Sequence, residues 1–351
     1  MSIYHKGFAS GRLWGESPEE EMERILSAHP VEFEERIDTL DRPLVLENAY
    51  PGWQARLWGP KELYPHPPIG YREGSIRFPP VPTCEDEQVR THVEAIRSGS
   101  ACIHLHPRAG NPEASPLTDP KACARIFDRI FMETDAITLQ HTWTMKKDNL
   151  IDYVAEGEKL LELAGGNRYV QGAVVLWPPT DAYPPNYTAE VQRGVNFMLA
   201  NKIKPIHKLR SAYAVRKMKR TLIDTGIEPP PYILVHDMGH PFGWPMDQNP
   251  WTSIDVIASL MQTKQRIPES VIGVYSGGRN WLPVTYAAIM AGVDIVRVGI
   301  EDIYWMYPHR DEVVRSNTHA VQKVTSFAKL IGREIASVAK AREVLDICRT
   351  S

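Results

Sequence analysis

The sequence has few cysteines, little net charge and no long apolar run, and each absence excludes a class of protein. The four cysteines among 351 residues show no C-x-x-C spacing, which excludes a disulfide-stapled scaffold and predicts the reduced thiols of a cytoplasmic protein. Forty basic side chains against 43 acidic ones leave a formal charge of −3, which argues against nucleic acid or an anionic membrane as a partner. Residues 1–15 lack the apolar core of a signal peptide, and no run of about 18 uncharged apolar residues occurs. Secretion and membrane spanning are therefore not expected.

Short apolar runs that alternate with amphipathic segments dominate the rest of the chain, and a hydrophobic content of 43% supports a substantial core. Candidate strands lie at residues 44–48, 101–104, 136–140, 169–175, 205–209, 232–236, 271–275 and 295–298. Candidate helices between them include residues 85–98, 148–164, 189–201, 253–265 and 283–292. About eight such β–α units predict an α/β protein with a (β/α)8 TIM barrel, and a doubly wound open sheet is the alternative.

The chain is predicted to have two parts. Residues 1–42 precede the first candidate strand and are expected to form an N-terminal helical extension, in which Ser17 is the N-cap and Pro18 the first helical residue. Residues 43–351 are expected to form the barrel, which is the catalytic domain and includes the C-terminal helices.

A His-x-His pair is the clearest chemical signal. His104 and His106 follow the apolar candidate strand 101–104, and Arg108 lies just beyond them. Because side chains two apart on a strand point to the same side, the two imidazoles could share one metal ion. Chance placement on a solvated strand face is the alternative, but unpartnered imidazoles at the end of a buried strand are costly. The pair therefore predicts a metal site.

The second signal lies at the end of the last candidate strand. Together with His104 and His106, Glu301 would form a His-His-carboxylate ligand set of the kind that binds catalytic zinc. Asp302 would then be free for proton transfer. Alternatively, both carboxylates cap the helix that follows. Arg297 alternates with two valines and so points to the other side of the strand, where it needs either Asp302, a substrate carboxylate or a structural carboxylate as its anion.

Several longer sequence motifs resemble those of a known enzyme family. The motifs His-Leu-His-x-Arg at 104–108 and Val-Arg-Val-Gly-x-Glu-Asp at 296–302 are followed by Arg-Ser-Asn at 315–317 and by Leu-Ile-Gly-Arg-Glu-Ile-Ala at 330–336 with Ala-Arg-Glu-Val-Leu at 341–345. In these motifs the chain resembles the β-keto acid cleavage enzymes, from about residue 44 to residue 345.

The resemblance implies a zinc-dependent (β/α)8 barrel that uses acetyl-CoA to cleave a β-keto acid in retro-Claisen fashion, giving acetoacetate and an acyl-CoA. It implies zinc ligation by His104, His106 and Glu301, and an acid/base function for Asp302 paired with Arg297. The chemistry suits these residue types, because zinc polarises a keto oxygen and a carboxylate removes the acidified proton. The expected partners are a small β-keto acid and a CoA thioester, and the expected assembly is a homodimer or homotetramer.

Departures from the family pattern concentrate on the substrate side. His141 and Thr142 stand where the family has a Ser-Thr-Gly-Gly turn, Gln54 stands where it has a Glu, and the acidic fifth strand becomes Ile-His-Lys-Leu-Arg at 206–210. These changes favour a non-amino β-keto acid, whether neutral, aromatic or anionic. The predicted substrate-binding residues are Gln54, Arg108, His141, Thr142, Tyr169 and Arg279, with Arg279 directed to a CoA phosphate or a carboxylate.

Two other functions fit the His-x-His pair. A TIM-barrel metal-dependent hydrolase would need further metal-binding histidines on later strands, and His207 and His236 are the candidates. The Glu-Asp ending of the last strand does not suit that class. A non-catalytic metal-binding barrel is the third hypothesis, and only the altered substrate turns favour it.

Overall fold

Eight short parallel strands form the centre of the protein. The computed structural model describes residues 17–28, 38–50, 84–105, 120–139, 154–177, 186–238, 252–277, 280–303, 305–310 and 312–348. The strands are β1 (Val45–Tyr50), β2 (Cys102–Leu105), β3 (Ile137–Thr138), β4 (Gly172–Trp177), β5 (Lys204–Leu209), β6 (Tyr232–Met238), β7 (Ser270–Ser276) and β8 (Ile295–Val298). Each lies within a few residues of its predicted strand.

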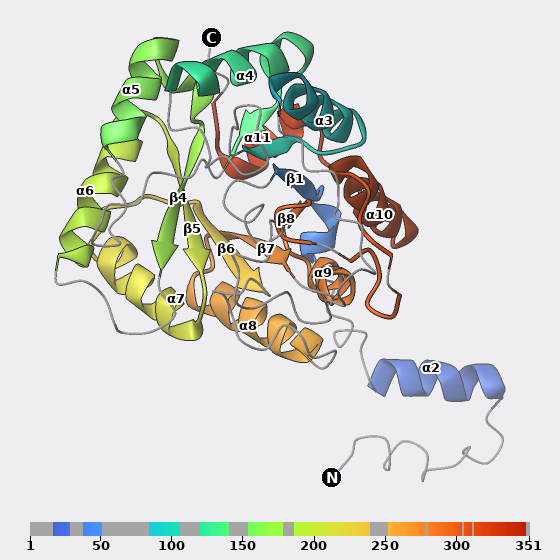
Figure 1. The fold of residues 1–351 in the computed structure, drawn as a ribbon. Helices are drawn as coiled ribbons and strands as arrows, with labels where there is room; N and C mark the ends of the chain where they lie inside the picture. The colour runs from blue at the N-terminus through green and yellow to red at the C-terminus, as the bar shows by residue number, and fades with distance from the viewer. Residues whose placement is uncertain are drawn as a thin grey trace. The chain divides into compact units, whose positions relative to one another are not determined.

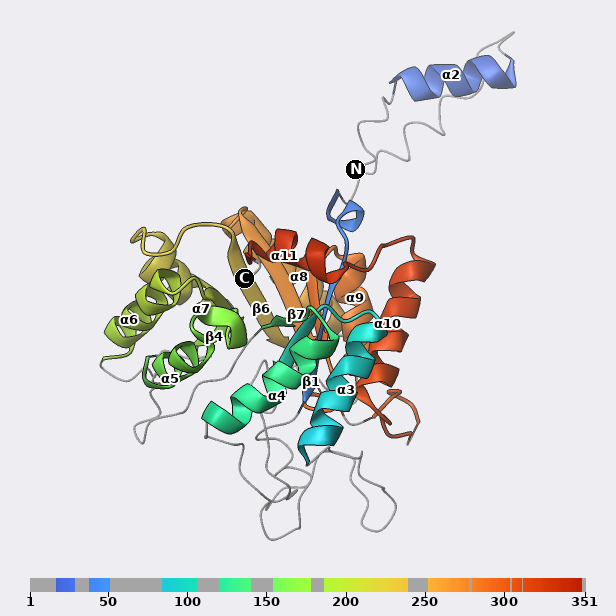
Figure 2. The ribbon, with the colours of Figure 1, turned by 90° about the horizontal axis from the view of Figure 1, so that it is seen from above.

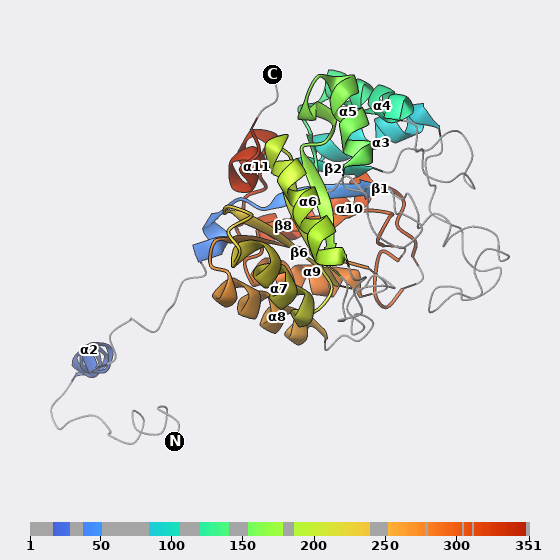
Figure 3. The same ribbon diagram turned by 90° about the vertical axis from the view of Figure 1, so that its left-hand side faces the viewer.

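The strands follow the order β3-β2-β1-β8-β7-β6-β5-β4, and every neighbouring pair is parallel. The first strand along the chain, β1, pairs with the last strand, β8, so the two lie side by side (Figure 3). The remaining edges, β3 and β4, also adjoin, because the Gln171 backbone N–H donates to Thr138 Oγ1 at 3.1 Å. The predicted (β/α)8 barrel is thus confirmed, and the open sheet is excluded.

Helices surround this sheet (Figure 1). They are α3 (Glu85–Arg97), α4 (Pro120–Glu133), α5 (Ala155–Ala164), α6 (Tyr187–Ala200), α7 (Ala212–Met218), α8 (Thr252–Arg266), α9 (Trp281–Met290), α10 (Asn317–Leu330) and α11 (Val338–Leu345), with shorter helical turns η2 (Asp38–Asp41), η5 (Asn167–Tyr169) and η6 (Lys219–Ile223). Helix α3 shows why such segments are helical: acidic side chains occupy its first turn and Arg97 its last, which complements the helix dipole.

Alternation along each strand separates two apolar layers. Val235 and Tyr275 belong to a cluster inside the barrel, whereas Leu234, Val274 and Val296 belong to the larger cluster between the strands and the helices. Because parallel strands in a barrel are buried on both faces, nearly every residue of β6, β7 and β8 is buried. The alternation also fixes which polar side chains point inward.

The amino end of the barrel is closed by the C-terminal segment. Leu345 of α11 packs in the inner cluster, and Figure 2 shows α11 at this end of the strands. Arg333 is buried here and donates to the carbonyl oxygens of Arg42, Ile289 and Val293. This end is therefore filled by packing and hydrogen bonds, which leaves the carboxyl end for chemistry.

The chain divides into two units, Met1–Asp38 and Thr39–Ser351. In the first, helix α2 (Pro18–Ala28) begins as predicted: Ser17 Oγ accepts from the Glu20 backbone N–H at 3.1 Å, and Glu20 accepts from the Ser17 N–H at 2.7 Å. No helix of the described residues is long and apolar enough to cross a membrane.

The position just after β8 must be a glycine, Gly299, because the chain there passes close to the backbone of β1. Its φ is +152°, and a Cβ at this position would lie 2.1 Å from the Ala49 carbonyl oxygen. We expect Gly299→Ala to lower the free energy of unfolding by roughly 3 kcal/mol or more, measured by urea denaturation. The matched control is Gly332→Ala, which has a φ of +78° but no atom within 4 Å, and it should cost only about 1 kcal/mol. Equal losses in the two variants would contradict the close contact between β8 and β1.

Candidate active site

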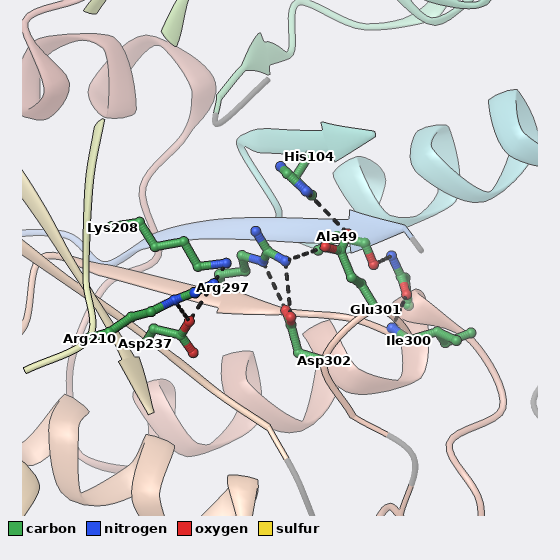
Figure 4. Close-up of polar contacts among 10 residues, drawn as sticks. Ala49, His104, Lys208, Arg210, Asp237, Arg297, Ile300, Glu301 and Asp302 are labelled. Carbon is green, nitrogen blue, oxygen red and sulfur yellow. Dashed lines mark hydrogen bonds and ion pairs between the residues drawn. The ribbon is translucent and has the colours of Figure 1, made fainter. Parts of the chain in front are cut away.

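A buried arginine lies at the centre of the carboxyl end of the barrel. Arg297, on β8, is only 1% exposed and points inward, because its neighbours Val296 and Val298 pack in the outer cluster. Its Nε and Nη2 donate to the two carboxylate oxygens of Asp302 at 2.8 and 3.0 Å (Figure 4). Its Nη2 also lies 2.8 Å from Glu301 Oε1. One guanidinium thus holds both carboxylates of the Glu-Asp motif.

The turn that carries these carboxylates is fixed to β1 and α10. Asn317, the first residue of α10, accepts from the Ile300 backbone N–H at 2.9 Å and donates to the Ala49 carbonyl oxygen at 3.0 Å. Helix α10 is capped by Ser316, whose Oγ accepts from the His319 N–H. Glu301 and Asp302 therefore do not cap this helix, which removes the capping interpretation of the two carboxylates.

The first histidine of the His-x-His pair meets the same turn. His104 lies on β2 with 1% exposure, and its Nε2 is 3.2 Å from Glu301 Oε2. Two ligands of one tetrahedral zinc, each bound at about 2.0–2.2 Å, would be separated by a similar distance, so this pair fits the predicted metal set. His106, the third predicted ligand, lies outside the described residues, and within the described part of the chain no group of three potential ligands converges.

The electrostatics of this group reflect its burial. Burial, together with the repulsion of the neighbouring Glu301 carboxylate, raises the pKa of Asp302 to about 6 against the opposing attraction of the Arg297 guanidinium. Burial lowers the pKa of Arg297, but the carboxylates of Asp302, Glu301 and Glu47 outweigh it and leave the net pKa above its ordinary value. The Arg297 guanidinium thus favours the Asp302 anion, but burial outweighs this attraction and leaves the pKa of Asp302 above its ordinary value.

A second charged group lies on β5 to β7, beside Arg297 (Figure 4). Arg210 Nε donates to Asp237 Oδ2 at 3.0 Å, and Lys208 Nζ lies 3.8 Å from the same oxygen. The ring of Tyr275 contacts both groups: the Lys208 ammonium is 4.4 Å and the Arg297 guanidinium 4.6 Å from the ring centroid. The inner wall from β5 to β8 thus carries three cations.

Tyr169 is not brought to this site. The predicted strand starts at Tyr169, whereas β4 starts at Gly172, so Tyr169 lies in η5 at the amino end of the strand. Its hydroxyl donates to Asp128 Oδ2 at 2.9 Å, and its ring stacks on Phe127. The other predicted substrate-binding residues lie outside the described residues: Gln54, Arg108, His141, Thr142 and Arg279.

The two histidines proposed for a hydrolase site lie on the outer side of the barrel. His207 alternates with inward Lys208; it accepts from Trp177 Nε1 at 3.1 Å and contacts Glu228 Oε2 at 2.6 Å, so both of its ring nitrogens are engaged. His236 alternates with Asp237, and burial lowers its pKa to about 4. Neither histidine lies beside His104, which removes the main support for that class.

The sequence did not predict a function for three residues of this site. Glu47 pairs in register with Arg297 and is fully buried, and its signal is a lone carboxylate at an inward position of an apolar strand. Tyr275 acts through contacts inside the barrel, and Asn317 acts through hydrogen bonds from α10 to the backbone of Ala49 and Ile300. Spacing along the chain carries no signal for such contacts.

The fold and site together define an enzyme class: a (β/α)8 barrel with a buried acid–base cluster at its carboxyl end. A sequence model of the β-keto acid cleavage enzymes matches residues 68–347, and the chain belongs to that family. The members of this family are enzymes that cleave β-keto acids.

Two curated relatives span most of the chain. A 3-keto-5-aminohexanoate cleavage enzyme of Acetoanaerobium sticklandii is 28% identical over 279 residues, which are 77% of this chain and 93% of that protein. A 3-dehydrocarnitine:acetyl-CoA trimethylamine transferase of Rhizobium meliloti is 23% identical over 292 residues, covering 77% and 91%. A solved structure, the ternary complex of ObcA with a C4-CoA adduct and oxalate, superposes with a TM-score of 0.60 at 14% identity, covering 76% of this chain and 67% of that one, and it shows the shared fold.

Removal of the central guanidinium should destabilise the fold strongly. Arg297→Met leaves two buried carboxylates without their cation, and we expect the free energy of unfolding to fall by about 3–5 kcal/mol in urea denaturation. Adding Asp302→Leu to this variant should recover at least about 1 kcal/mol. The control is Arg129→Met, which removes an exposed ion pair to Asp86 and should cost under about 1 kcal/mol. A loss no larger than in the control would mean that Arg297 is not the charge on which this cluster depends.

Proposed function

We propose that the protein is a zinc-dependent enzyme that cleaves a β-keto acid with acetyl-CoA, giving acetoacetate and a new acyl-CoA. The observation that carries the proposal is the convergence of Arg297, Asp302, Glu301 and His104 at the carboxyl end of the barrel. In this reaction the bond between C2 and C3 of the keto acid breaks, and C2 forms a bond to the acetyl carbon. The CoA thiolate moves from the acetyl group to the remaining acyl group.

The proposed metal ligands are His104, His106 and Glu301. The 3.2 Å separation of His104 Nε2 and Glu301 Oε2, and the burial of both side chains, support a shared ion. Zinc bound there would supply Lewis acidity toward the keto and carboxylate oxygens of the substrate.

The proposed base is Asp302. Its two oxygens are held by Arg297 in a bidentate pair, so its position is fixed before substrate binds. A pKa raised to about 6 by burial makes this carboxylate a stronger base than an exposed aspartate while it stays mostly ionised at neutral pH. Arg297 is the positioning residue, and Asn317 holds the turn on which the base lies.

The proposed substrate is a non-amino β-keto acid. The names of the two relatives contain compounds that carry an amino or a trimethylamine group. In this chain two cations, Lys208 and Arg210, lie on the inner side of β5, where they would repel an ammonium group.

Zinc content tests the ligand set. Wild-type protein purified with zinc should hold one equivalent per chain, while His104→Ala and Glu301→Ala should lose it, measured by elemental analysis after dialysis. His309→Ala is the control, because His309 is an exposed histidine after β8 and should leave the zinc content unchanged. Full occupancy in a His104→Ala/Glu301→Ala double variant would overturn the ligand assignment.

Product formation tests the reaction. Acetoacetate and a new CoA ester should appear when wild-type protein is incubated with acetyl-CoA and a panel of β-keto acids, followed by mass spectrometry. Asp302→Asn should keep its zinc and lose turnover by about 100-fold or more, because only the base is removed. Unimpaired turnover in this variant would exclude Asp302 as the base. Hydrolysis that does not depend on CoA would favour a metal hydrolase instead.

A further inference from the structure

Two cations at the carboxyl end of β5 share a single carboxylate inside the barrel. Ile206 packs in the inner cluster, and residues two and four positions further along a strand point to the same side, so Lys208 and Arg210 both face inward. Their common partner is Asp237 of β6, at 3.0 Å from Arg210 Nε and 3.8 Å from Lys208 Nζ. The close contact belongs to Arg210, which leaves Lys208 beyond hydrogen-bonding distance of this carboxylate.

The carboxylates on the β8 side face other groups. Both oxygens of Asp302 accept from Arg297, while Glu301 Oε1 lies 2.8 Å from Arg297 Nη2 and Glu301 Oε2 lies 3.2 Å from His104 Nε2. The Lys208 ammonium packs on the face of the Tyr275 ring, with Nζ 4.4 Å from the ring centroid. A ring face compensates an ammonium less fully than an anion does.

Burial makes this arrangement expensive. Lys208 is 9% exposed, and burial lowers its pKa to about 8 despite the attraction of Asp237. A methionine or leucine would fill the same inward position at lower cost. A charged side chain at this position is therefore better explained by a ligand than by stability.

The ammonium lies beside the reacting end of the site. Lys208 and Arg297 contact the same Tyr275 ring, and the Lys208 side chain extends toward Arg297 in Figure 4. Arg210 lies just beyond the carboxyl end of β5, and its side chain is 18% exposed. The two cations thus line one wall, from beside Arg297 outward.

We propose that Lys208 and Arg210 bind an anionic group at the far end of the substrate, so that the β-keto acid is a dicarboxylate and the acyl-CoA product carries a free carboxylate. This inference rests on the proposed cleavage reaction. Asp237 is the positioning residue that orients Arg210 and leaves the Lys208 ammonium for the ligand.

Binding of unreactive probes tests the anion site without catalysis. Calorimetry on wild-type protein should show glutarate binding at least about tenfold more tightly than valerate or 5-aminovalerate, because a hydrogen bond between charged groups contributes about 1.5–3 kcal/mol. Lys208→Met should abolish this preference and Arg210→Met should weaken it, with circular dichroism confirming that both variants fold. The matched control, Lys204→Met, removes a lysine of the same strand that pairs with Asp346, and it should keep the preference. Equal binding of the three probes to wild type, or a preference that survives in Lys208→Met, would overturn the proposal.

Turnover separates this inference from the proposed function. With 3-oxoadipate, 3-oxohexanoate and 6-amino-3-oxohexanoate as matched substrates, wild-type kcat/KM should be highest for the dicarboxylate. The ratio of dicarboxylate to neutral kcat/KM should fall at least about tenfold in Lys208→Met and stay constant in Lys204→Met. Cleavage that prefers the neutral or amino acid would overturn the anion site and leave the reaction standing. A glutarate preference that depends on Lys208, without cleavage of any of the three acids, would keep the anion site and overturn the reaction.

Discussion

A guanidinium buried inside the barrel is the constraint on which the site depends. Arg297 is 1% exposed, and such a charge is stable only if carboxylates surround it. Asp302 and Glu301 satisfy this need in one turn after the same strand, and Glu47 adds its charge from the adjacent strand β1. The cost of burying one cation therefore determines where the reactive carboxylates lie.

This arrangement gives the two carboxylates different tasks. Asp302 is gripped through both oxygens, whereas Glu301 offers only one oxygen to Arg297 and turns the other toward His104. The proposed division into a base and a metal ligand follows from this difference in contacts. Gly299 and Asn317 keep the turn against β1, so the division depends on backbone packing as well as on charge.

The sequence predicted the barrel well, because its strands are buried on both faces and form apolar runs between amphipathic helices. The alternation of β8 predicted that Arg297 points inward but left its anion open, and only the family resemblance implied the pairing with Asp302. The sequence misplaced Tyr169 in the substrate site, because a residue at the start of the fourth strand lies at the amino end of the barrel, and the strand itself begins three residues later, at Gly172. The convergence of Lys208, Tyr275 and Arg297 depends on pairing across four strands, β5 to β8, which periodicity along one strand cannot reveal.

The most direct test is a crystal structure of the zinc-loaded protein, with an anomalous difference map measured at the zinc edge. The buried cluster predicts one peak about 2.0–2.2 Å from His104 Nε2 and from a Glu301 carboxylate oxygen, with Asp302 still paired to Arg297 and not bound to the ion. A peak at another place in the barrel, or zinc bound by Asp302 in place of Glu301, would contradict the division of tasks between the two carboxylates.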